Sequence, residues 1–130
     1  MFKSPTYGKL HIEQIPDKIL TFYLDHTKYD APVHIIVGTD SQNFDDTKIV
    51  SVVAVICEGH GGMFFYEITR RALIRDVRTK LHTETNDSLK VAETLVEIME
   101  NDKKYEEMYL NCPIAIHADA GNSKNGQTRE

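Results

Sequence analysis

The sequence predicts a mixed α/β domain in which three antiparallel strands, a crossover helix and a fourth strand follow one another along the chain. Apolar runs at residues 33–40, 49–58 and 63–70 are joined by short polar connections, which is typical of an antiparallel meander. A long helical pattern covers about residues 73–103, and one more apolar run lies at residues 112–121. Because a helix separates the last strand from the meander, that strand can pair in parallel with the first.

The composition predicts one globular domain, which we expect to cover residues 1–130. The chain has 41% hydrophobic and 27% charged residues, an ordinary balance for a single core. Its net charge of -5 argues against coating of nucleic acid by the whole surface. No apolar run approaches the roughly 20 residues of a membrane span, and the N-terminus MFKSPTYGK has no signal-peptide core. We therefore expect a cytoplasmic protein without a membrane partner.

Local patterns justify each element in turn. A helix is predicted from about residue 11 or 16 to 27, because Ile15, Ile19 and Phe22 recur at helical spacing. The strands at residues 33–40 and 49–58 are almost continuously apolar, which predicts burial on both faces. The two cysteines lie in apolar segments without a CxxC spacing, so we expect buried thiols in a reduced compartment.

The long helix is predicted to bury an acid. One of its faces, stepping by three or four residues, consists of Val77, Leu81, Glu84, Ser88, Ala92, Leu95 and Met99. A carboxylate on the inward face must be paired, protonated or bound to a metal ion. Alternatively, the helix begins near Thr83, and Glu84 then interacts with the dipole of its first turn.

Two aspartates end the first and fourth strands. Asp40 follows VHIIVGT, and Asp119 follows CPIAIHA. If these strands are parallel neighbours, both carboxylates lie at the edge where open α/β sheets place their ligands, and they repel each other unless a cation lies between them. Asp40, Glu84 and Asp119 would then offer the hard oxygen ligands that Mg²⁺ or Mn²⁺ prefers. Taken singly, Asp before Ser or Gly is also a common turn residue.

Basic residues gather just before and within the start of the long helix. In TRRALIRDVRTK, Arg71, Arg75 and Arg78 are spaced so that a helix would align them on one face, and Lys80 follows. Such a stripe on an acidic protein could bind the phosphates of a nucleic acid. It could equally be a solvated helix face.

These motifs resemble a known superfamily. GTDSQ in the first strand, the meander, RTKLHTE at the helix entry and HADAG at the end of the fourth strand are similar to ribonuclease-H-like proteins, and more narrowly to the small bacterial YkuK-type group of predicted nucleases. The resemblance covers about residues 5–130. It implies the ribonuclease-H-like mixed sheet, with catalytic and metal-binding acids at Asp40, Glu84 and Asp119.

The resemblance further implies a Mg²⁺-dependent nuclease, a hydrolase acting on RNA, DNA or a hybrid. Members usually carry another ligand on a late helix, whereas this chain ends at Glu130, so we expect the domain to lack its C-terminal helix-strand-helix portion. Ser41 and His117 are auxiliary candidates, although a strand histidine is more often only hydrogen-bonded.

Two other functions remain open. The chain could be a non-catalytic domain that binds nucleic acid or protein and retains only the fold. Alternatively, GNSKNGQT at residues 121–128 has the form of a phosphate-binding loop, in which Gln127 replaces the essential lysine.

Overall fold

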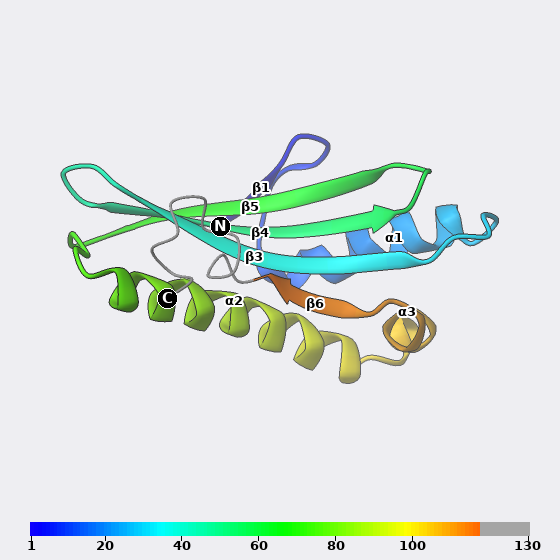
Figure 1. Ribbon diagram of the computed structural model, residues 1–130. Helices are drawn as coiled ribbons and strands as arrows, with labels where there is room; N and C mark the ends of the chain where they lie inside the picture. Colours follow the sequence, from blue (N-terminus) through cyan, green and yellow to red (C-terminus); the bar gives the residue numbers. More distant parts are fainter. Residues whose placement is uncertain (118–130) are drawn as a thin grey trace.

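The computed structural model describes residues 1–117. Two groups of strands, each followed by helices, precede a last strand (Figure 1). Their order and bounds are β1 (Phe2–Ser4), β2 (Gly8–Leu10), η1 (Ile12–Gln14), α1 (Ile15–His26), β3 (Val33–Asn43), β4 (Thr47–Cys57), β5 (Gly62–Arg71), α2 (Val77–Glu100), η2 (Lys103–Tyr105), α3 (Glu106–Asn111) and β6 (Ile114–His117).

The strands form one mixed sheet with the order β2-β1-β5-β4-β3-β6. The long strands β3, β4 and β5 pair antiparallel, and β6 pairs parallel with β3 from Ile35↔Ile114 to Gly38↔His117. The predicted meander, crossover helix and parallel fourth strand are therefore confirmed. Within the described residues, β6 is an edge strand.

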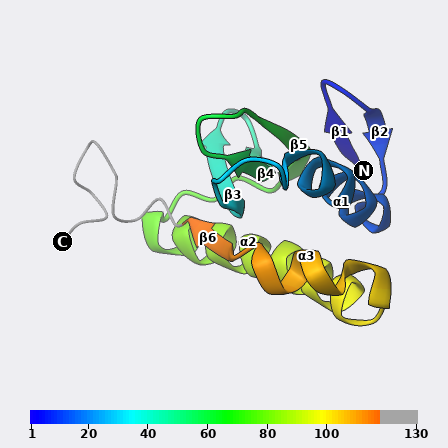
Figure 2. The same ribbon diagram turned by 90° about the vertical axis from the view of Figure 1, so that its right-hand side faces the viewer.

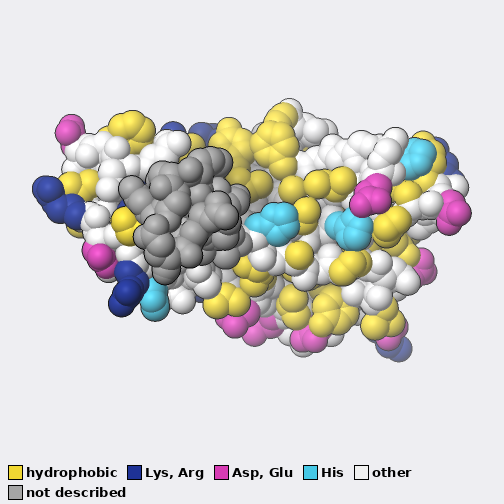
Figure 3. Space-filling model, in the orientation of Figure 1, with side chains coloured by type: hydrophobic (Ala, Val, Ile, Leu, Met, Phe, Trp, Pro, Cys, Tyr) yellow, Lys and Arg dark blue, Asp and Glu magenta, His cyan; other side chains and the backbone are white. Residues whose placement is uncertain are grey.

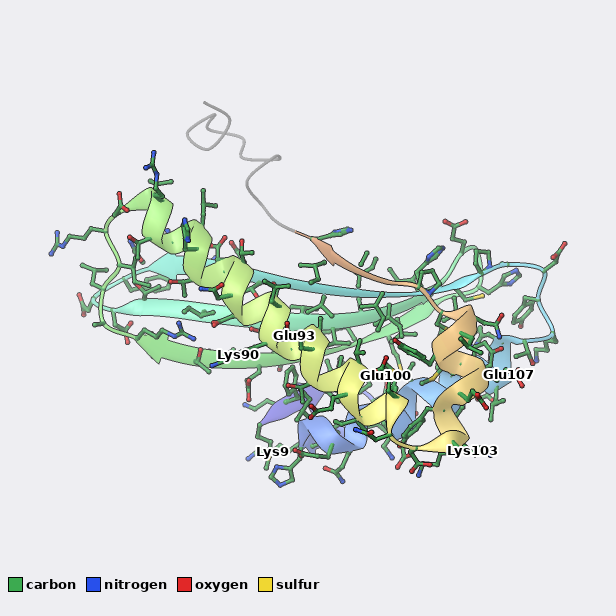
Figure 4. All side chains as sticks on the ribbon, turned by 90° about the horizontal axis from the view of Figure 1, so that it is seen from below. Lys9, Lys90, Glu93, Glu100, Lys103 and Glu107 are labelled. Atoms are coloured by element: carbon green, nitrogen blue, oxygen red, sulfur yellow. The ribbon has the colours of Figure 1, made fainter. Side chains whose placement is uncertain are left out.

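The helices cover one face of the sheet. Seen from below, α2 and α3 cross in front of the strands, with α1 beside them (Figure 4). Their apolar side chains share one core with the odd-numbered residues of β3 and β4, including Ile19, Leu95, Ile35 and Val53, all fully buried. None of the helices in residues 1–117 is both long and apolar enough to cross a membrane.

Among residues 1–117, no helix or strand covers the other face of the sheet, so the prediction that the first two strands are buried on both faces was wrong. Burial alternates along both strands, with the odd-numbered residues buried from Val33 to Ser41 and from Thr47 to Cys57. The even-numbered residues, most of which are apolar, are half-buried or exposed. A continuous apolar run therefore does not reveal whether a second layer covers the strand. Figure 2 shows the strands above α2 and α3 with the β1–β2 hairpin at one end.

Several local features agree with the sequence. Helix α2 begins at Val77, because the Asp76 side chain caps it by accepting a hydrogen bond from the Thr79 amide at 2.9 Å. Cys57 and Cys112 are free and buried, and burial raises the pKa of the Cys112 thiol to about 11. The hairpin β1–β2 and the short helix α3 were not predicted.

Candidate functional site

Glu84 is the centre of a buried polar cluster between α2 and the sheet. The residue lies two turns into α2, only 9% of its surface is exposed, and its Oε2 accepts a hydrogen bond from the Ser41 hydroxyl of β3. The predicted inward orientation is confirmed. The alternative, in which Glu84 belongs to the first turn of a helix that starts near Thr83, is wrong because the Asp76 cap starts α2 at Val77.

A row of buried hydroxyls lies beside this pair. Ser88, one turn after Glu84, is 2.8 Å from the Thr39 hydroxyl, which in turn lies 3.4 Å from the Ser51 hydroxyl. All three residues are at most 7% exposed. Hydroxyls can donate and accept, so the row satisfies its own polar atoms in a site that excludes most water.

Asp40 lies next to Ser41 but on the other side of the strand. Strand β3 pairs with β4 without interruption through Asp40↔Val50 and Ser41↔Ile49, so side chains alternate strictly between the two faces. Asp40 is exposed on the open face, whereas Ser41 is buried against α2. The structure thus brings Glu84 to Ser41, and it does not bring Asp40 and Glu84 to one face of the sheet.

The third proposed acid, Asp119, lies outside the described residues, as does the glycine loop at residues 121–128. The described part of β6 ends at His117, an exposed residue that pairs with Gly38, two residues before Asp40. Among residues 1–117, no group of three or more His, Cys, Asp or Glu side chains could hold a metal ion. The proposed set cannot appear there in full, because one of its members is not described.

The basic residues do not form the predicted helical stripe. Arg71 ends β5, Arg75 lies in the connection, and only Arg78 and Lys80 belong to α2. The prediction of one aligned helix face was wrong because β5 extends to Arg71 and the Asp76 cap delays the helix. These residues still lie close together in the chain, and Lys and Arg side chains show at the left end of the molecule in Figure 3.

Arg71 is engaged with a carboxylate. Its guanidinium donates two hydrogen bonds to Asp87 of α2, at 2.8 and 2.9 Å. The pair closes one side of a cleft of about 480 Å³ between β5 and α2, and Ser51 also lines that cleft. Both bonds come from one nitrogen, Nη2, and the Asp87 side chain is only 14% exposed, so a phosphate would have to compete with Asp87 for Arg71.

Sequence reasoning missed the buried hydroxyls and the open face. The sequence did contain a signal for the buried hydroxyls. Thr39 and Ser41 are alternate residues of the same largely apolar strand and therefore share one side, and Ser51 pairs with Thr39 from the next strand. Which side faces a helix is not encoded in the strand itself.

Comparisons with known proteins agree with this architecture. Residues 14–130 match the model of the family described as Ribonuclease H-like. No curated protein and no solved structure matches the chain. The match covers most of the sequence and agrees with the mixed sheet and the parallel β3–β6 pair, so the chain belongs to the Ribonuclease H-like family, as its YkuK-type motifs indicated.

Proposed function

We propose that the protein hydrolyses phosphodiester bonds of RNA, DNA or a hybrid with the help of Mg²⁺ or Mn²⁺. The observation that carries this proposal is Glu84, a nearly buried carboxylate bonded to Ser41, the residue that follows Asp40. Buried carboxylates are costly and are retained where charge is used. Family membership supports the same reaction class, although function does not follow from fold alone.

The residues that would hold the metal are Asp40, Glu84 and Asp119. Carboxylate oxygens are the donors that Mg²⁺ and Mn²⁺ prefer, and the two described acids fit that preference. A bound ion would supply activation of water and stabilisation of charge on the leaving oxygen. The Ser41 hydroxyl holds the Glu84 carboxylate in one orientation, and the partly enclosed site limits its exposure to water.

Hydrolysis of labelled single-stranded, duplex and hybrid oligonucleotides with Mg²⁺ or Mn²⁺ tests the proposal. Asp40→Asn and Glu84→Gln should each lower the rate at least about 100-fold, the size of effect expected when a group that stabilises the transition state is lost. Glu93→Gln is the matched control, since Glu93 is exposed on the same helix. Equal rates in the wild type and both site variants would exclude these acids from catalysis.

Metal binding is measured separately because Asp40 projects from β3 to the open face, whereas Glu84 of α2 lies on the other side of that strand. Calorimetric titration with Mn²⁺ should show weaker binding in both site variants if one ion uses both carboxylates. Loss of binding in only one variant would contradict a shared ion.

Because Asp40 and Glu84 lie on opposite sides of β3, a second candidate function is also favoured, a ribonuclease-H-like domain that binds nucleic acid without cleaving it. This candidate predicts oligonucleotide binding that is unchanged by EDTA and no hydrolysis by the wild type with either metal.

A further inference from the structure

The face of the sheet that no described element covers carries apolar, aromatic and basic side chains. By the strand register, the residues that share this face, which we call the open face, include Lys3, His34, Ile36, Gly38, Asp40, Lys48, Val50, Val52, Ala54, Ile56, Phe64, Tyr66, Ile68, Arg70, Ala115 and His117. Three large apolar side chains on it are well exposed, namely Ile56 at 38%, Phe64 at 44% and Ile68 at 46%. Contiguous exposed apolar surface of this kind marks an interaction site.

Two neighbouring aromatic rings stand at the centre of this surface. Phe64 and Tyr66 are alternate residues of β5, and their ring centroids are 6.1 Å apart with planes tilted by 33°. Their direct partners on β4 are small, because Phe64 pairs with Ala54 and Tyr66 pairs with Val52. A planar base can therefore lie on either ring without meeting a long neighbouring side chain from β4.

Positively charged side chains lie near the two rings and could bind the phosphates of a nucleic acid. Lys3 pairs with Tyr66 across β1 and β5, and Lys48 pairs with Arg70 at the end of the face near Asp40. Arg70 is bonded to Asp46 at 2.8 Å, so the lysines provide most of the available positive charge. Histidine side chains and hydrophobic surface lie together on the side drawn in Figure 3.

The helical side carries charges of both signs, since Figure 4 labels glutamates such as Glu93 and lysines such as Lys90 there. The open face carries Lys3 and Lys48 as well as the carboxylate of Asp40. The net charge of -5 therefore does not describe the open face, where a polyanion meets lysines beside the aromatic rings.

From these observations we infer that the open face binds single-stranded nucleic acid, with bases stacked on Phe64 and Tyr66 and phosphates held by Lys3 and Lys48. Stacking on aromatic rings and contacts of lysines with phosphates are the two general means of holding a single strand. A duplex hides the faces of its bases and could not use the rings. The inference rests on the proposed function and deepens it, because it assigns the substrate class and its path.

The proposed path of the bound nucleic acid leads to Asp40, which lies on the same face of the sheet as Phe64 and Tyr66. Asp40 lies two strands across the sheet and one side-chain row along from Tyr66, a separation of roughly 12 Å at about 4.8 Å between strands and about 6.8 Å between rows. A single-stranded nucleic acid whose bases stack on the rings of β5, and which then continues across β4, therefore reaches Asp40.

Fluorescence anisotropy of labelled oligouridylate and oligothymidylate of about 12 nucleotides, a length within the usual range of single-strand sites, tests the inference. The titrations are done in EDTA, so that binding is measured without hydrolysis. Phe64→Leu keeps an apolar side chain and removes the ring, and it should weaken binding about 5- to 100-fold, the loss expected for one stacked base. Phe64→Tyr should retain binding, and Leu110→Ala, an exposed apolar control on α3, should have no effect.

The lysines are tested through the salt dependence. Lys3→Gln and Lys48→Gln should each reduce the slope of log affinity against log salt by about 0.7, the value for one phosphate contact in a single strand. Lys103→Gln is the matched control on the helical side and should leave the slope unchanged. Circular dichroism of each variant shows whether the fold is retained.

The outcomes separate this inference from the proposed nuclease. Wild-type binding that Phe64→Leu weakens by the expected factor, without hydrolysis in Mg²⁺ or Mn²⁺, would support the open-face inference and overturn the proposed nuclease. Hydrolysis that is unaffected by Phe64→Leu, together with equal binding by all variants, would overturn the open-face inference and leave the nuclease standing. A dimer that Ile68→Asp dissociates, with no oligonucleotide binding, would show that the face is a protein interface and would also overturn the inference.

Discussion

The contact between Ser41 and Glu84 yields a prediction of measurable size. Ser41→Ala removes the hydroxyl that donates to the buried Glu84 carboxylate. A hydrogen bond to a charged group contributes about 1.5–3 kcal/mol, and Ser41→Ala removes one such bond from Glu84. The free energy of unfolding should fall by about 2 kcal/mol, which corresponds to a decrease in Tm of roughly 6–10 °C for a domain of this size.

Urea denaturation followed by circular dichroism measures this loss, and a double-mutant cycle assigns it to the pair. Glu84→Gln removes the charge but keeps an acceptor, so the Ser41→Ala change should cost about 1 kcal/mol less in the Glu84→Gln background. Thr85→Ala is the matched control, because Thr85 is exposed beside Glu84 and should change stability by less than about 0.5 kcal/mol. A Ser41→Ala loss as small as that of the control, or a coupling energy near zero, would refute the reasoning.

Two further predictions concern groups whose protonation the fold changes. Hydrogen bonds from Tyr105 and Lys104 lower the pKa of Asp17 below 3.8, so its ionised form stabilises the fold above that pH, and this stability is lost as the pH falls through the lower folded pKa. Tyr105→Phe should therefore flatten the acid limb of a plot of Tm against pH, and an unchanged limb would contradict the assignment. Burial raises the pKa of Cys112 from 9.0 to about 11, so stability should decrease between those two pH values as the unfolded thiol ionises first. Cys112→Ala should remove this decrease, and native Cys112 should react with iodoacetamide far more slowly at pH 8 than in urea.

Charged residues lie on both sides of the protein. The surface of α2 carries both acidic and basic residues, while the sheet carries Lys3 and Lys48 beside the rings of Phe64 and Tyr66. Net charge alone argued against coating of nucleic acid by the whole surface, and that argument remains sound. The net charge does not decide whether the open face binds nucleic acid, because screening limits interactions between exposed charges to about 10 Å at ordinary salt concentrations.

Periodicity by itself determined the types and order of the main elements. Apolar runs of strand length predicted β3, β4 and β5, and the three-to-four spacing of α2 predicted that Glu84 turns inward. Both predictions depend on local geometry, the two-residue repeat of a strand and the 3.6-residue repeat of a helix. The hairpin β1–β2 escaped prediction because its strands have three residues each and depend on pairing with β5 through Lys3↔Tyr66.

Only the tertiary structure decided what each side of the sheet meets. The sequence showed that Asp40 and Ser41 point in opposite directions, but a strand does not record which of its sides a helix will cover. Helices α1 and α2 pack on the side of Ser41, so that residue reaches Glu84, and Asp40 is left on the open face. The placement of Arg71 was decided in the same way, because the long-range pairing that extends β5 and the bond to Asp87 outweigh the helical spacing of the arginines.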